Sequence, residues 1–148
     1  MRGALIALRI GNRLLGNPEG AAALELTLVG GEFRFEIDTW VALTGSDFGA
    51  ALDEAVVPPW IVQPVRKGQM LRMQATRAGA RCYLCTSGGI DVPIVLGSRS
   101  THVLSGLGGF GGLIQAVGIG IPPPLCGPIG NPACCCCGRC AAGCRGWG

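Results

Sequence analysis

The chain has 148 residues, which is enough for one domain with a sizeable core and too few for two comfortable domains. Apolar residues make up 49% of the sequence and charged residues 14%, a balance that excludes disorder of the whole chain. The formal net charge of +3 is small and the basic residues form no stripe interleaved with aromatics, so we expect no nucleic-acid partner.

The N-terminal segment predicts one helix, from Ala4 to Leu15. Its leucines and isoleucines recur with a mostly helical period, and Arg9, Asn12 and Arg13 are expected on the polar side. Gly16-Asn17-Pro18 then ends the helix with residues that tolerate a left-handed backbone and with a helix breaker. Because charged residues soon interrupt the first apolar run, no secretory signal is recognisable and a cytoplasmic location is expected.

From Ala22 the pattern changes to short runs that favour β-strands. The runs are Ala23 to Val29, Glu32 to Ile37, Thr39 to Thr44, Gln69 to Ala75 and Ala80 to Thr86. Between them, Pro58-Pro59-Trp60 and Pro64 indicate loop or edge strand, because proline cannot donate to a ladder. The sequence therefore predicts a mainly β fold with one flanking N-terminal helix and a closed or nearly closed antiparallel sheet. Trp40, Trp60 and Phe35 are expected in the core or at the barrel mouth.

Two aspartates lie in turn-like contexts next to glycine. Asp47 follows Thr44-Gly45-Ser46, and Asp91 follows a pair of glycines and Ile90. A carboxylate in such a turn can face a cleft or can simply cap its own turn, and the sequence leaves both interpretations open. His102 is the sole histidine, and no catalytic triad can be assembled around it.

The segment from Gly88 to Thr101 ends in five residues suited to binding an anion. Arg99 offers a planar fork of donors, while Ser98, Ser100 and Thr101 add hydroxyl groups. Gly97 lets backbone N–H groups approach a ligand closely. An ordinary surface turn on a β-protein has the same composition, so this alternative also stays open.

The segment Val103 to Ile121 carries no charge, but its glycines and the prolines that follow disfavour a membrane-spanning helix, and we expect no membrane partner.

The tail beyond it contains seven of the nine cysteines, including the pair Cys137 and Cys140 at CxxC spacing. Adjacent cysteines cannot all point at one tetrahedral ion, so we predict no metal and an unstructured tail. Cys82 and Cys85 are three apart in a predicted strand and should face opposite sides of the sheet.

Seven segments, in order from Leu8 to about Gly112, form one recognisable pattern. They are Leu8 to Pro18, Ala23 to Glu25, Ala42 to Asp47, Pro58 to Trp60, Ala80 to Leu84, Gly88 to Thr101 and Gly106 to Gly109. This pattern resembles the carboxyltransferase subdomain A and B family, which holds a 5-oxoprolinase subunit, an allophanate hydrolase subunit and the Kip-type kinase-inhibitor antagonists. The resemblance implies a cyclophilin-like β-barrel, of which this chain would be a part.

The resemblance also implies a function within a complex. In an ATP-dependent 5-oxoprolinase, two carboxyltransferase-like subunits and a third subunit open the lactam of 5-oxoproline to glutamate, and relatives within urea carboxylase move a carboxyl group from carboxybiotin to urea. We therefore expect a hydrolase subunit for a small cyclic amide or urea-derived substrate, with ATP used by the complex and biotin possible. The alternatives are a non-catalytic interaction module of the same family and a metal-binding or redox protein that uses the cysteine tail.

Within that function, Arg99 is expected to clamp an anionic group, with Gly97, Ser98, Ser100 and Thr101 lining the site as substrate-binding residues. Asp47, which matches the family's Thr-Gly-Ala-Asp segment with serine in place of alanine, is the candidate for proton transfer.

Three departures from the family pattern qualify the resemblance. His102 stands where the family usually has aspartate, and Gly112 to Gly118 lacks the expected arginine and aspartate. Some thirty residues that precede the helix in family members have no counterpart. We expect a fragment truncated at both ends, inactive in isolation, with a partial carboxyltransferase-like domain over 1–112 and a Gly/Pro/Cys-rich tail over 113–148.

Overall fold

The computed structural model describes residues 2–101. The segment Val103 to Ile121, His102, the cysteine tail and the domain boundary at 112 lie outside the described residues. Within them, no helix combines the length and apolarity needed to cross a bilayer.

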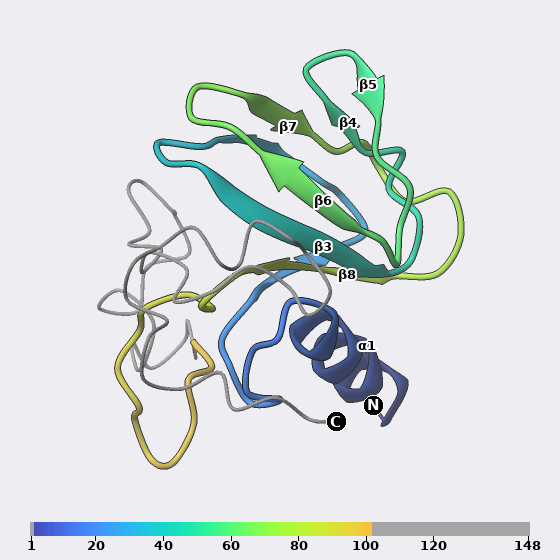
Figure 1. Ribbon diagram of the computed structural model, residues 1–148. Helices are drawn as coiled ribbons and strands as arrows, with labels where there is room; N and C mark the ends of the chain where they lie inside the picture. The colour runs from blue at the N-terminus through green and yellow to red at the C-terminus, as the bar shows by residue number, and fades with distance from the viewer. Residues whose placement is uncertain (1, 102–148) are drawn as a thin grey trace, which may run out of the picture.

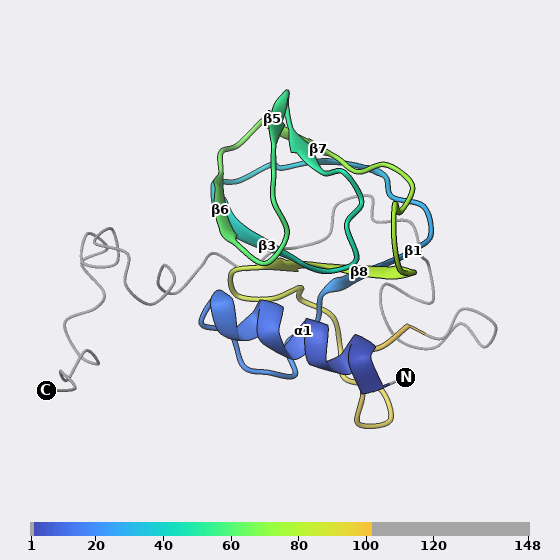
Figure 2. The same ribbon diagram turned by 90° about the vertical axis from the view of Figure 1, so that its right-hand side faces the viewer.

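The fold has three layers, a helix on one sheet and a second sheet on the other side (Figures 1 and 2). The helix is α1 (Arg2–Leu14). The first sheet has the order β1 (Leu24–Thr27), β8 (Arg81–Thr86), β3 (Thr39–Gly45), β6 (Val62–Val65), and the second has the order β2 (Glu32–Arg34), β7 (Met70–Arg72), β4 (Ala51–Leu52), β5 (Ala55–Val56). All pairings are antiparallel. The predicted mainly β fold with one flanking helix is confirmed, and the two sheets form a partial barrel.

The core is divided in two by the first sheet. Strand β3 is central and buried on both faces, so Val41 and Leu43 point between the sheets while Ala42 points toward α1. Phe35, Phe48 and Leu71 fill the inner core, as small barrels require bulky fillers. Thr44 faces the helix and donates from Oγ1 to the carbonyl of Ala7 at 2.8 Å, which leaves no buried polar group unpaired at this contact.

The helix ends where the sequence predicts. Gly16 takes a left-handed φ of 72° and donates to the carbonyl of Arg13 at 3.1 Å, while the amide of Asn17 donates to the carbonyl of Asn12 at 2.8 Å. These two bonds form a Schellman cap, which satisfies the last carbonyls of the helix. Asn12 itself was expected on the polar side of the helix, and this is wrong, because it is fully buried.

The strands differ from the predicted runs mainly in the middle of the chain. The β2 strand ends at Arg34 rather than Ile37, although Phe35 continues the pairing through its amide and the carbonyl of Gln69. Strands β4 and β5 have two residues each and carry no periodic pattern. Pro64 lies in β6, the edge strand of its sheet, as its missing N–H requires. Trp60 is not a core residue: it is 43% exposed, with a φ of +66°.

Helix and sheet approach each other closely at Gly11. A Cβ atom added there would lie 2.6 Å from Sγ of Cys85 and 2.9 Å from Oγ1 of Thr44. Both distances are shorter than real Cβ contacts, so only glycine lets α1 lie this near β3 and β8.

We predict that Gly11→Ala lowers the free energy of unfolding by about 1–3 kcal/mol, the usual cost of overpacking a core, despite the better helix propensity of alanine. Gly20→Ala is the matched control, because a Cβ at Gly20 meets nothing within 4 Å. Urea denaturation of both variants measures the difference. Equal stability of the two variants would show that the helix can move away from the sheet at little cost.

Cys82 and Cys85 point to opposite faces of β8, as predicted. Cys82 lies in the core between the sheets and Cys85 in the core under α1, and both are free thiols. Burial, only partly offset by a hydrogen bond from the Thr44 backbone, raises the pKa of Cys82 to about 11. Burial likewise raises the pKa of Cys85 to about 12. Both thiols are therefore neutral and unreactive at physiological pH.

These raised pKa values predict a loss of stability in alkali. The thiols ionise near their ordinary pKa of 9.0 in the unfolded chain but stay protonated in the folded one. The stabilisation is therefore complete below about pH 9 and decreases as the pH rises toward 11 or 12, by about 1 kcal/mol per pH unit for each thiol. Urea denaturation between pH 8 and 10.5 under reducing conditions should show a shallower decline for Cys85→Ala than for the unchanged chain; parallel declines would contradict the assignment.

Candidate functional site

The predicted anion-binding segment begins where β8 ends. Gly88 and Gly89 take left-handed φ values of 85° and 76°, and the amide of Gly89 donates to the carbonyl of Thr86 at 2.9 Å. Oγ1 of Thr86 also donates to the carbonyl of Gly89 at 3.1 Å, so two hydrogen bonds between Thr86 and Gly89 close the turn. The amide of Ile90 then donates to the carbonyl of Ala22 at 3.0 Å. The paired glycines thus set the direction in which the chain leaves the sheet.

Two asparagines attach this turn to the end of the helix. The side chain of Asn17 donates to the carbonyl of Thr86 at 2.8 Å and to Oδ1 of Asn12 at 3.1 Å, while its own Oδ1 accepts the amide of Gly88 at 2.8 Å. Asn12 donates to the carbonyls of Glu19 and Ala21 at 3.2 and 2.8 Å. Because amide groups both donate and accept, the pair connects three separate backbone segments.

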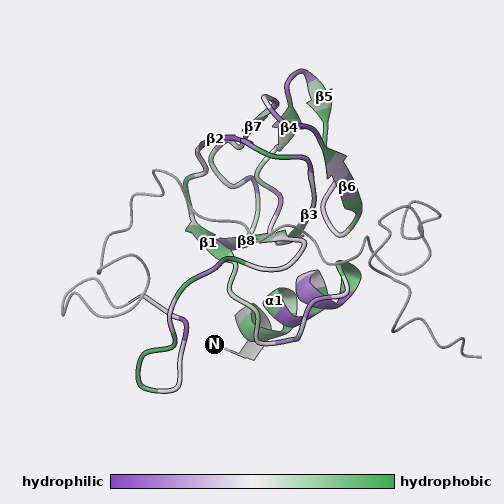
Figure 3. Cartoon of the chain, turned by 60° about the vertical axis from the view of Figure 1, so that its left-hand side comes forward, coloured by the Kyte–Doolittle hydropathy of each residue, from purple (hydrophilic) through white to green (hydrophobic). Residues whose placement is uncertain are grey.

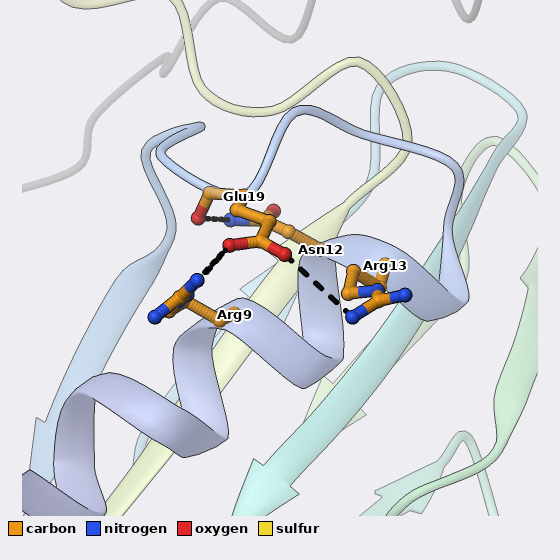
Figure 4. Close-up of polar contacts among 4 residues, drawn as sticks. All are labelled: Arg9, Asn12, Arg13 and Glu19. Carbon is orange, nitrogen blue, oxygen red and sulfur yellow. Dashed lines mark hydrogen bonds and ion pairs between the residues drawn. The ribbon is translucent and has the colours of Figure 1, made fainter.

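The loop after the helix is also held by charge. The carboxylate of Glu19 forms ion pairs with Arg9 and, at 3.7 Å, with Arg13, one helical turn apart (Figure 4). Their side chains are between 41% and 73% exposed, so each pair contributes little to stability. The ion pairs lie on the same side of the helix as the bonds from Asn12 to Glu19 and Ala21, which hold this loop in place.

Beyond Ile90 the segment folds back on itself as a small exposed hairpin. The amides of Val95 and Ser98 each donate to the other's carbonyl, at 2.8 and 3.0 Å. Leu96 and Gly97 between them take φ values of 51° and 76°, as in a tight hairpin turn with two left-handed residues. Ile94 and Leu96 are 62% and 91% exposed, and the middle of the segment is hydrophobic (Figure 3).

The structure brings Gly97, Ser98, Arg99, Ser100 and Thr101 together in this exposed segment. Nη1 of Arg99 donates to the carbonyl of Val92 at 2.9 Å, which closes the base of the hairpin. Oγ of Ser98 accepts the amide of Ser100 at 3.0 Å. One guanidinium nitrogen is thus used internally, and the other donors of Arg99 have no partner among the described residues.

Asp47 is not part of this group. Its Oδ1 accepts the amide of Gly49 at 2.8 Å, so the carboxylate caps its own turn while remaining exposed. In the β3–β8 register, Gly45 lies opposite Cys82 and Val41 opposite Thr86. Asp47 therefore follows one end of the strand pair and the Arg99 segment follows the other, about 13 Å further along.

The sequence interpretation missed a polar cluster on β1 and β8. The hydroxyl of Tyr83 donates to Oε2 of Glu25 at 2.6 Å, and Nε of Arg81 lies 3.4 Å from Oε1 of the same carboxylate. Burial, followed by the hydrogen bond to Glu25, raises the pKa of Tyr83 to about 12. Only the strand register, in which Glu25 and Tyr83 are direct partners, reveals this cluster. Within residues 2–101, no group of three or more metal-ligating side chains is present.

Comparison with known proteins agrees with the expected family. The sequence profile described as "Carboxyltransferase domain, subdomain A and B" matches residues 4–119. The chain is 45% identical over 117 residues to a 5-oxoprolinase subunit of Escherichia coli, covering 78% of this chain and 37% of that protein. It is 41% identical over 109 residues to a putative urea carboxylase of Emericella nidulans, covering 72% of this chain and 9% of that protein.

A solved structure has the same fold. The crystal structure of the Kluyveromyces lactis urea carboxylase superimposes with a TM-score of 0.73 at 36% identity, covering 76% of this chain and 10% of that one. The chain thus spans well under half the length of these relatives. The profile match extends over most of the sequence, and on this ground the chain belongs to the carboxyltransferase domain, subdomain A and B, family.

Proposed function

We propose that the chain is part of a multi-subunit enzyme of the 5-oxoprolinase or urea carboxylase type, acting on a small cyclic amide or urea-derived substrate. The observation that carries the proposal is the 45% identity to the 5-oxoprolinase subunit of Escherichia coli. The partners are a sister carboxyltransferase-like subunit and a third subunit. ATP is consumed by the complex, and biotin serves only if the chemistry is carboxyl transfer, as in a urea carboxylase.

In this proposal Arg99 holds the anionic, oxygen-rich group that both chemistries share. Its guanidinium uses Nη1 to brace the hairpin, so the remaining donors of the fork are available to a carboxylate or carbonate-like group. Ser98, Ser100 and Thr101 orient the ligand with their hydroxyl groups, and the left-handed φ of 76° at Gly97 directs the backbone around it. Asp47 serves in proton transfer at a point beyond the other end of β8.

A non-catalytic interaction module is the second candidate. The exposure of Ile94 and Leu96 at 62% and 91% favours it, because bulky apolar side chains at the tip of a hairpin are suited to contacting another protein. In that case the chain would bind partner subunits without contributing to the reaction.

The test is ATP-dependent formation of glutamate from 5-oxoproline, with the full 148-residue chain reconstituted with the two partner subunits. We expect activity that requires the chain, and a fall of about 100-fold in kcat/KM for Arg99→Ala, the loss typical of removing charge-assisted hydrogen bonds from a bound anionic group. Arg66→Ala, at another exposed turn, should leave the rate unchanged.

Two results would contradict the proposal in different ways. Glutamate formation that does not depend on the chain removes the enzymatic role and leaves the interaction module. Full activity of Arg99→Ala removes the anion site from residues 97–101 while the enzymatic role stands.

A further inference from the structure

Two loops at one end of the barrel are tied together by backbone hydrogen bonds. They are residues 45–49, between β3 and β4, and residues 76–79, between β7 and β8 (Figure 1). The amide of Arg77 donates to the carbonyl of Asp47 at 3.1 Å, and the amide of Ser46 donates to the carbonyl of Arg81 at 2.8 Å. The amide of Gln74 adds a bond to the carbonyl of Phe48 at 2.8 Å, so that Gln74 and Arg81, which flank the 76–79 loop, are also bonded to the 45–49 loop. The backbones that carry the side chains of the two loops are therefore fixed relative to each other.

Each loop presents one charged side chain that has no ionic partner. Within residues 2–101, ion pairs with glutamates engage five other arginines: Arg9, Arg13, Arg34, Arg72 and Arg81. Arg77 and Asp47 are exposed and form no ion pair, either with each other or with another described residue. A free guanidinium and a free carboxylate thus belong to loops that contact one another.

One glycine, Gly49, lies next to both charged groups. The guanidinium of Arg77 lies over Gly49, where an added Cβ would be 3.3 Å from Nη2. The amide of Gly49 is also the group that holds Oδ1 of Asp47 at 2.8 Å, which leaves Oδ2 without a partner in the described chain. Gly49 therefore has the donor and the acceptor as neighbours, with φ at +55°, where other residues are strained.

We propose that the 45–49 and 76–79 loops bind a small planar amide, a lactam or a urea. An amide carries a carbonyl acceptor beside an N–H donor, which matches a guanidinium beside a carboxylate. Arg77 donates to the carbonyl oxygen and Oδ2 of Asp47 accepts the N–H. The choice of amide class rests on the proposed function, but the site does not include Arg99, whose segment leaves β8 at the opposite end.

Ligand-detected NMR titration of the full chain with 2-pyrrolidinone tests the site, because this lactam has no carboxylate to attract other arginines. We expect saturable binding that weakens by about 10-fold or more in Arg77→Gln and in Asp47→Asn, the change typical of losing a hydrogen bond to a charged group. N-Methyl-2-pyrrolidinone, which lacks the N–H, should bind more weakly than the parent lactam and be insensitive to Asp47→Asn. Arg66→Gln, at the turn after β6, is the matched control and should bind normally.

Absence of saturable binding to the unchanged chain would overturn the proposal, and so would equal affinity of Arg77→Gln and Arg66→Gln. Binding lost in Arg99→Gln but kept in Arg77→Gln would overturn it by moving the site to the hairpin. Circular dichroism of each variant checks that it is folded.

The glutamate assay of the reconstituted complex separates this inference from the proposed function. Arg77-dependent lactam binding without glutamate formation supports the site and removes the enzymatic role. Unchanged glutamate formation by Arg77→Gln supports the enzymatic role and overturns the site.

Discussion

The packing of α1 against β3 and β8 at Gly11 is the constraint on which the rest of the fold depends. The backbone of the helix lies so near the sheet here that a Cβ at Gly11 would overlap the Cys85 sulfur and the Thr44 hydroxyl. This proximity lets Thr44 reach the carbonyl of Ala7 and buries Asn12 completely. A larger separation would leave the Thr44 hydroxyl without this partner in an apolar layer, which is costly. The glycine and the polar contacts therefore support one arrangement.

A series of hydrogen bonds connects this contact to the start of the segment that carries Arg99. Asn12 is held by the helix, Asn17 is held by Asn12, and Asn17 in turn holds the carbonyl of Thr86 and the amide of Gly88. The chain leaves β8 in a direction fixed by side chains that lie far away in the sequence. After Ile90 this support ends, since the bonds of residues 92–100 connect the hairpin mainly to itself. The start of the segment, at Thr86 and Gly88, is therefore held by the rest of the protein, whereas, among the described residues, Arg99 is held only within the hairpin.

Local patterns predicted much of the fold, whereas contacts between distant segments could not be read from the sequence. Gly16-Asn17-Pro18 predicted the helix end because its conformation is local, and Pro64 predicted an edge strand because its missing N–H excludes a central one. Asn12 was misplaced because polarity alone put it on the solvent side, although its helical position lies between Leu8 and Leu15 on the buried face. The two-residue strands β4 and β5 exist only through pairing with β7 and each other. For the same reason, nothing local associates Asp47 with Arg77, thirty residues away.

Arg77 and Arg99 lie on segments that are held to the barrel to different degrees, and this affects the free energy of binding a ligand. Ordering a mobile loop on binding costs free energy, so a donor on a constrained frame yields more affinity for the same hydrogen bonds. Arg77 belongs to a loop bonded to its neighbour at both ends, through Gln74 and Arg81. Arg99 belongs to a hairpin joined to the barrel through the turn at Gly88 and Gly89. A small neutral amide, which offers few contacts, suits the constrained pair of Arg77 and Asp47, whereas a charged anion gains stronger, charge-assisted hydrogen bonds from Arg99.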